Sequence, residues 1–245
     1  MLQKTWLLKP EPDTQDVCLL QKELGVHETI CKLLAQRKIN SLEKAKRFFR
    51  PSKQNIHNPM VMKNMPEAIE RIKKAIDKKE KILIYGDYDV DGTTAVAMVF
   101  SFFKDFYTNL SYYVPDRYTE GYGISLKSID FAFENDVKLI IALDCGIKAV
   151  DKVAYAKLKG IDYIICDHHL PGKNLPDGII LNPKQVDCNY PFKELSGAGV
   201  GFKLLQAYCK KNNIDIEKAN IYLDLLAISI GADMVPIIEE NRLLA

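Results

Sequence analysis

Long apolar runs are absent from this chain of 245 residues, although 47% of its residues are hydrophobic. No stretch approaches the ~18 apolar residues that a membrane-spanning helix needs, and the first residues lack the apolar core and cleavage site of a signal peptide. Net charge is also small, because 34 basic and 32 acidic residues leave a formal charge of +2. Overall charge therefore argues neither for nor against nucleic acid. From the absence of a membrane-spanning run and of a signal peptide, we expect a cytoplasmic protein with no membrane partner.

Paired cysteines are absent too. The six cysteines are scattered and form no C-x-x-C pair. In a chain of this length they are most simply reduced, mostly buried thiols, so a disulfide framework is not expected. Internal repeats and low-complexity segments are also lacking.

Residues 1–64 are predicted to form a small helical region and a linker. Apolar residues recur at helical spacing in 16–24 and 28–37, and Asn40 with Glu43 resembles an N-terminal capping pair for a third helix. Residues 51–64, with two prolines, are predicted to be irregular. Basic residues crowd 37–53, and two interpretations stay open: a solvated helix face, or a surface that attracts phosphates.

Residues 65–245 are predicted to form an α/β domain with a mostly parallel sheet and helices on both faces. Short apolar runs alternate with amphipathic stretches, a pattern typical of such sheets. The expected strands are 82–86, 110–114, 138–143, 163–166 and 179–181. One expected helix begins at Pro66, and the others cover 93–107, 125–135, 148–159, 199–211 and 217–231.

Acidic and imidazole side chains follow three of the predicted strands. They are Asp87, Asp89 and Asp91 after the first, Asp144 after the third, and Asp167, His168 and His169 after the fourth. Carboxyl ends of parallel strands meet at one edge of a sheet, where ligands bind. Crowded carboxylates repel one another unless cations compensate, and mixed carboxylate and imidazole ligands suit Mn²⁺, Mg²⁺ or Zn²⁺. The sequence therefore predicts a metal site with enough ligands for two ions.

Of two other interpretations of the first acidic motif, one fails and the other fits less well. Asp87-x-Asp89-x-Asp91-Gly92 matches the start of an EF-hand calcium loop, but the twelfth position is Met98 instead of a glutamate. The motif beginning at Asp89 also resembles the nucleophile motif of haloacid-dehalogenase-type phosphatases. In that family the first aspartate directly follows the strand, and the two histidines would have no role.

Three further segments contain possible phosphate-handling residues. Residues 196–201, Ser-Gly-Ala-Gly-Val-Gly, open a helix whose backbone N–H groups either face an anion or only allow close helix packing. Arg117 either pairs with neighbouring acids or binds a substrate phosphate. Tyr118 and Tyr122 either stack on bases or pack in the core. Cys145 and Cys166, which adjoin the acids, are interpreted as buried packing residues and not as thiolate ligands.

The acidic motifs, the 113–123 loop, residues 196–201 and the Gly231-Ala232-Asp233 segment together resemble the DHH phosphoesterase superfamily, and within it the RecJ-type single-stranded-DNA-specific exonucleases. The resemblance implies two divalent ions, Mn²⁺ or Mg²⁺. It implies that Asp89 and Asp91 each bind one ion, that Asp144 bridges them, and that His168 and Asp233 complete the shells; Asp224 is a less suitable rival to Asp233. The resemblance also implies supporting or catalytic roles for Asp87, Asp167 and His169. It implies substrate contacts for Arg117, Ser196, Gly197, Gly199 and His169.

The implied activity is 5′-to-3′ hydrolysis of single-stranded DNA in repair and recombination, with a single-strand-binding protein and a helicase as partners. The alternatives are a DHH phosphodiesterase that acts on short oligonucleotides or cyclic dinucleotides, and a non-catalytic DNA-binding relative. Family members also carry a second DHH-associated domain and an OB-type module. We therefore expect this chain to be the N-terminal catalytic portion and to be weakly active alone.

Overall fold

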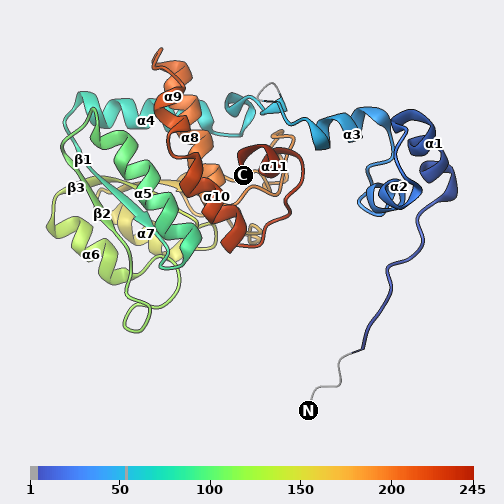
Figure 1. Ribbon diagram of the computed structural model, residues 1–245. Helices are drawn as coiled ribbons and strands as arrows, with labels where there is room; N and C mark the ends of the chain where they lie inside the picture. The colour runs from blue at the N-terminus through green and yellow to red at the C-terminus, as the bar shows by residue number, and fades with distance from the viewer. Residues whose placement is uncertain (1–4, 53–54) are drawn as a thin grey trace. The chain divides into compact units, whose positions relative to one another are not determined.

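The computed structural model describes residues 5–52 and 55–245, and its internal contacts divide the chain between Asn55 and Ile56. The first unit contains the three expected helices, α1 (Thr14–Leu24), α2 (Glu28–Ala35) and α3 (Leu42–Phe49) (Figure 1). They enclose a small core of Val17, Leu20, Cys31 and Leu34.

The cap of α3 differs from the prediction by one residue. Ser41 Oγ accepts the N–H of Lys44 at 3.3 Å and caps the helix. Asn40 instead donates its side-chain amide to Asp16 at 3.3 Å. Both residue types cap helices well, so the sequence alone could not separate these neighbours.

The second unit is built on a five-stranded parallel sheet in the order β2-β1-β3-β4-β5. This confirms the predicted α/β class and all five strands. The strands are β1 (Lys81–Gly86), β2 (Leu110–Tyr113), β3 (Val137–Leu143), β4 (Asp162–Cys166) and β5 (Ile179–Leu181).

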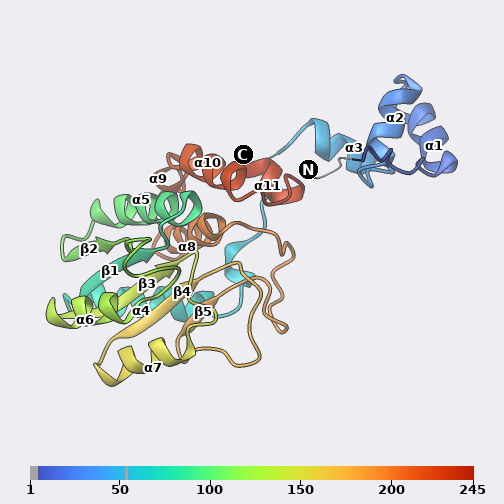
Figure 2. The same cartoon turned by 90° about the horizontal axis from the view of Figure 1, so that it is seen from below.

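Helices cover both faces of the sheet because alternate residues of each strand point to opposite sides. Ile82 and Ile84 of β1 belong to one core, and Leu83 and Tyr85 belong to the other. The first core is closed by α4 (Met65–Asp77), α5 (Val90–Lys104), α8 (Gly197–Lys211) and α10 (Leu223–Ala232); the second is closed by α6 (Leu126–Glu134) and α7 (Val150–Leu158). Figure 2 shows α6 and α7 on the opposite side of the sheet from α5 and α8.

Three details depart from the predictions. Residues 217–231, expected as one helix, form α9 (Glu217–Asn220) and α10 with a break between them. The short helices η2 (Pro59–Val61) and α11 (Glu239–Leu244) were not predicted. Residues 56–64, which we grouped with the N-terminal region, pack within the second unit through η2. Among the described helices, none is long and apolar enough to cross a membrane.

Candidate metal centre

The strand register brings the predicted acids to one level of the sheet. Gly86 of β1 pairs with Leu143 of β3, and Leu143 pairs with Cys166 of β4. The next residue along each strand is an aspartate. The acids therefore lie at the carboxyl edge of β1, β3 and β4. In the strand order β2-β1-β3-β4-β5, successive strands are added on one side up to β2 and on the other side from β3 onward. The edge between β1 and β3 is the place where such sheets bind ligands.

His168 is the centre of a cluster of three carboxylates. Its Nε2 lies 3.3 Å from Asp144 Oδ1, 3.6 Å from Asp233 Oδ2 and 3.8 Å from Asp91 Oδ2. Asp91, Asp144 and His168 are buried, and Asp233 is partly buried. The structure thus brings together one imidazole and three carboxylates that come from four different elements or their ends.

The atoms at this cluster are suited to hold a cation. Asp144 Oδ1 and both ring nitrogens of His168 are buried and have no hydrogen-bond partner among the described residues. Burial, followed by repulsion from Asp91 and Asp89, raises the pKa of Asp144 to about 10, and burial raises the pKa of Asp233. Buried polar atoms without partners are costly, and a divalent ion would satisfy these atoms and stabilise the ionised carboxylates.

The N-terminus of α8 holds Asp91. The N–H groups of Gly197 and Ala198 donate to Asp91 Oδ2 and Oδ1 at 2.6 and 2.8 Å, and the N–H of Gly199 donates to Ser196 Oγ at 3.1 Å. We expected these groups to face a substrate phosphate; in this structure each of the three N–H groups has a partner inside the protein. The anion at the helix terminus is a side chain of the site itself.

Close packing explains the glycine that begins α8. A Cβ atom at Gly197 would lie 2.5 Å from Asp144 Cβ and Oδ1. Asp144 itself has a φ of 59°, a left-handed conformation that aspartate tolerates better than most residues. The backbone of α8 and the end of β3 can therefore approach closely enough for Asp91 and Asp144 to face the same imidazole.

Asp87 and Asp89 lie beside this cluster and make different contacts. Asp87 is fully buried; its Oδ1 accepts the N–H of Tyr88 at 2.9 Å, and its Oδ2 has no partner among the described residues. Burial raises the pKa of Asp87. Asp89 is exposed and caps α5, since its Oδ1 accepts the N–H of Gly92 at 2.9 Å. The two acids thus differ in burial, and Asp87 is the one with an unsatisfied buried oxygen.

His169 is fixed from both sides of its ring. Asp167 Oδ1 lies 2.7 Å from His169 Nδ1, and the hydroxyl of Tyr122 lies 3.1 Å from Nε2. Burial of Asp167 opposes its ionisation, but hydrogen bonds from His169 and from the N–H of Ile147 outweigh burial and lower its pKa. The hydrogen bond to Asp167 raises the pKa of His169. Asp167 therefore orients His169, and both of its oxygens already accept hydrogen bonds.

The 113–123 loop is organised by Glu120 and leaves Arg117 available. Glu120 accepts hydrogen bonds from Tyr113 and Ser125 at 3.0 and 2.7 Å. Arg117 forms no ion pair within the described residues, and its guanidinium lies 5.4 Å from the ring centroid of Tyr88. Tyr118 is 92% exposed, which excludes the core-packing interpretation for that tyrosine. Tyr122 is also exposed, despite its contact with His169.

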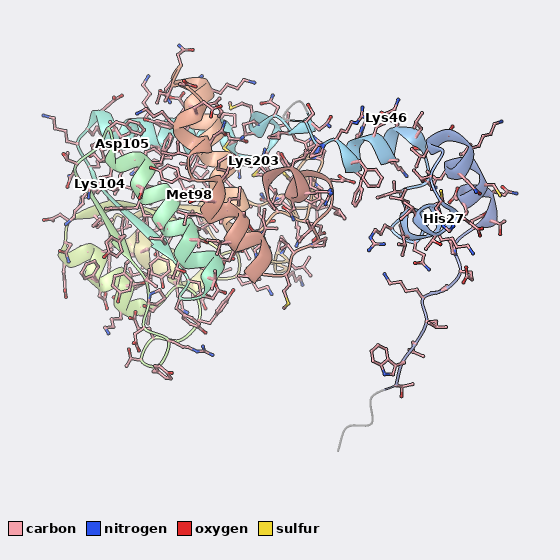
Figure 3. The ribbon with its side chains drawn as sticks, viewed as in Figure 1. His27, Lys46, Met98, Lys104, Asp105 and Lys203 are labelled. Carbon is pink, nitrogen blue, oxygen red and sulfur yellow. The ribbon has the colours of Figure 1, made fainter. Side chains whose placement is uncertain are left out.

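Several rivals for ligand roles are placed elsewhere. Cys145 and Cys166 belong to the two apolar cores, where burial raises the pKa of both thiols. Asp224 is exposed and accepts the N–H of Leu225. Met98 lies on α5 (Figure 3) and is fully buried, consistent with the exclusion of an EF-hand.

A cavity of about 210 Å³ opens beside His169. Its walls include Tyr122 and Ile147, and Lys148 and Lys152 also line it. Neither lysine forms an ion pair within the described part of the chain. Asp167 and His169, which pair with each other, also line the cavity. Two lysines next to an acidic cluster are suited to a phosphate whose charge is shared with cations.

Two residues of this region were not predicted from the sequence. Ser229 donates its hydroxyl to Asp91 Oδ1 at 2.7 Å, and Tyr88 lies between Arg117 and Tyr122. A serine in the apolar stretch before Asp233 was the only available signal for Ser229. Tyr88 had a signal in its place between two of the acids, but aromatic residues in such turns are common.

Comparison with known proteins gives a consistent result. Residues 81–230 match the model of the "DHH family, N-terminal domain". The chain is 42% identical over 96% of its length to the single-stranded-DNA-specific exonuclease RecJ of Bacillus subtilis, and 36% identical over 75% of its length to that of Escherichia coli K12. It spans 29% and 34% of these relatives, so about a third of their length or less is represented.

Two solved RecJ structures are similar in fold to this chain. A crystal structure of exonuclease RecJ bound to manganese superposes with a TM-score of 0.68 at 30% identity, over 75% of this chain and 46% of that one. A structure of RecJ in complex with Mn²⁺ from Thermus thermophilus gives a TM-score of 0.77 at 24% identity, over 96% and 33%. The second likeness concerns the fold alone.

Proposed function

This chain belongs to the DHH family, and from that premise we propose that it is the catalytic portion of a nuclease that hydrolyses single-stranded DNA from the 5′ end with two divalent ions, Mn²⁺ or Mg²⁺. The carrying observation is the cluster of His168 with Asp91, Asp144 and Asp233, whose buried polar atoms lack partners. The RecJ relatives support single-stranded DNA as the substrate. Repair and recombination, a cytoplasmic location, and single-strand-binding protein and helicase partners are part of the same proposal.

The residues divide into a holding set and an orienting set. Asp91, Asp144, His168 and Asp233 would hold one ion, and Asp89 with Asp144 would hold the other; Asp87 supports them with its unpartnered oxygen. When bound, such a pair of cations neutralises the phosphate, activates a water and stabilises the leaving oxygen. We predicted that the catalytic part begins at residue 65; the compact unit that contains these residues begins at Ile56.

The orienting set acts on the phosphate. Asp167 and Tyr122 hold His169 at its two nitrogens, so the imidazole keeps one orientation beside the acidic edge. The hydrogen bond to Asp167 raises the pKa of His169 and favours the protonated ring, which would place a positive charge beside a bound phosphate. Arg117 has no acidic partner among the described residues and provides a guanidinium suited to a neighbouring phosphate.

The direct test is Asp144→Ala assayed with Mn²⁺ and with Mg²⁺ on single strands labelled at the 5′ or the 3′ end. We expect loss of hydrolysis by at least two orders of magnitude with unchanged circular dichroism, since Asp144 would help to hold both ions. Early release of the 5′ label by the unmodified chain supports the direction. Full activity of a folded Asp144→Ala protein contradicts the mechanism.

The same assay separates the alternatives. Faster cleavage of dinucleotides or cyclic dinucleotides than of long strands would favour a phosphodiesterase for short substrates. Binding of single strands without hydrolysis under any metal, both by this chain and by a longer protein that also carries the expected C-terminal domains, would favour a non-catalytic relative. The presence of every ligand predicted from the motifs favours an enzyme over that relative.

A further inference from the structure

Ser229 is a fully buried polar residue in the apolar helix α10. Its Oγ lies 2.7 Å from Asp91 Oδ1 and 2.7 Å from Ser196 Oγ. Its carbonyl accepts the N–H of Asp233 at 2.9 Å, one helical turn later. One residue therefore contacts Asp91 with its side chain and Asp233 with its backbone, although the two acids are far apart in sequence.

The hydroxyl protons in this chain of contacts have a defined direction. Ionised Asp91 can only accept hydrogen bonds, so Ser229 donates to it. Ser196 Oγ already accepts the N–H of Gly199 at 3.1 Å, so its own proton is free to go to Ser229. The order of donation is Ser196 to Ser229 to Asp91, and each oxygen in the chain is satisfied.

The two oxygens of Asp91 are consequently unequal. Oδ1 accepts from Ala198 N–H and from Ser229, which uses its two lone pairs. Oδ2 accepts only from Gly197 N–H and lies 3.8 Å from His168 Nε2. One lone pair of Oδ2 is left, on the oxygen nearer the imidazole.

We propose that Ser229 is a positioning residue of the His168-centred metal site. Together with Ser196 it occupies Oδ1 of Asp91, so that only Oδ2 is left to bind a cation. It also holds Asp91 at a set distance from Asp233. The proposal rests on the proposed function, because it requires that this cluster binds a divalent ion. Groups that hydrogen-bond to metal ligands typically change metal affinity by about 10- to 100-fold when they are removed.

The test is Mn²⁺ affinity of the full chain, measured by electron paramagnetic resonance of free Mn²⁺ and by calorimetry, with no nuclease assay. Ser229→Ala should bind Mn²⁺ about 10- to 100-fold more weakly than the unmodified chain. Ser229→Thr keeps the hydroxyl and should bind more tightly than Ser229→Ala. Ser128→Ala is the matched control, because Ser128 is also fully buried and donates to the carbonyl of Ser125 at 2.7 Å, at the start of α6 across the sheet.

The outcomes separate this inference from the proposed function. If His168→Ala loses Mn²⁺ binding but Ser229→Ala binds as the unmodified chain does, the positioning role is overturned and the metal centre stands. If the unmodified chain binds no Mn²⁺, or His168→Ala binds equally well, both proposals fail. If Ser229→Ala does not fold, Ser196→Ala decides: a several-fold weaker affinity supports the inference, and an unchanged affinity overturns it.

Discussion

At the scale of single residues, Asp144 combines a left-handed backbone, burial and a pKa raised to about 10 by burial and by the carboxylates of Asp91 and Asp89. An aspartate in the unfolded chain ionises near pH 4. Between these two values the metal-free folded protein holds a proton that the unfolded chain has lost. The contribution of Asp144 to the stability of the metal-free protein therefore falls as pH rises from about 4 towards 10.

We expect Asp144→Asn to stabilise the metal-free protein and to weaken its stabilisation by Mn²⁺. Asparagine keeps the shape and tolerates the positive φ, and it removes the need to take up a proton. At pH 8 with EDTA, a gain on the order of 1 kcal/mol would raise the melting temperature by about 2–4 °C. Differential scanning fluorimetry with EDTA and with Mn²⁺ checks the prediction, and equal destabilisation under both conditions would contradict it.

At the scale of elements, α8 joins the metal centre to the rest of the unit. Its residues from Gly197 to Cys209 are all buried. Its first N–H groups bind Asp91, and Lys203 in its middle forms an ion pair with Glu240 of α11 at 2.5 Å, with both side chains fully buried. Glu240 also accepts hydrogen bonds from the backbone N–H of His57 and the hydroxyl of Tyr190.

Lys203→Met is predicted to lower the free energy of unfolding by about 3–5 kcal/mol, because it leaves Glu240 buried without its charge partner. Urea unfolding measures the change. Lys104→Met is the control: Lys104 is an exposed lysine of α5 (Figure 3), and its loss should cost no more than about 0.5 kcal/mol. Adding Glu240→Gln to Lys203→Met should recover part of the loss, and a cost equal to that of the control would show that the pair contributes little.

At the scale of the whole molecule, the chain consists of two units with separate cores. All proposed ligands belong to the second unit, and so do the contacts of Asp91, Ser229 and Glu240 described above. The basic residues of 37–52 belong to the first. The proposed metal site and the basic residues of 37–52 therefore belong to different units of the chain.

A fragment of residues 56–245 should retain the full stabilisation by Mn²⁺. Ligand binding to the folded state adds about 2.7 kcal/mol when the free ion is at a hundred times its dissociation constant, and no proposed ligand is removed by the truncation. Melting temperatures of the fragment and of the full chain, each with and without Mn²⁺, provide the comparison. A smaller shift for the fragment would mean that the first unit contributes to the site.

Much of the fold was predictable because its signals are local. Apolar runs such as 139–143 predict strands, and an aspartate directly after three of these runs predicts an acidic sheet edge. The break between α9 and α10 was missed because both segments share one apolar pattern. The role of the α8 terminus was missed because glycine-rich helix starts suit a bound phosphate and a bound carboxylate equally well.

By itself the sequence determined the class of fold, the acidic edge and the family resemblance, since each depends on residue order within one segment. Tertiary structure alone decided which groups meet. Asp91 and Gly197 are 106 residues apart. No local hydrophobic pattern specifies that the N–H of Gly197 donates to the carboxylate of Asp91. The same holds for Ser229 with Asp91 and for Lys203 with Glu240, because long-range pairing follows from the packing of α5, α8, α10 and α11 and not from the pattern of any one of them.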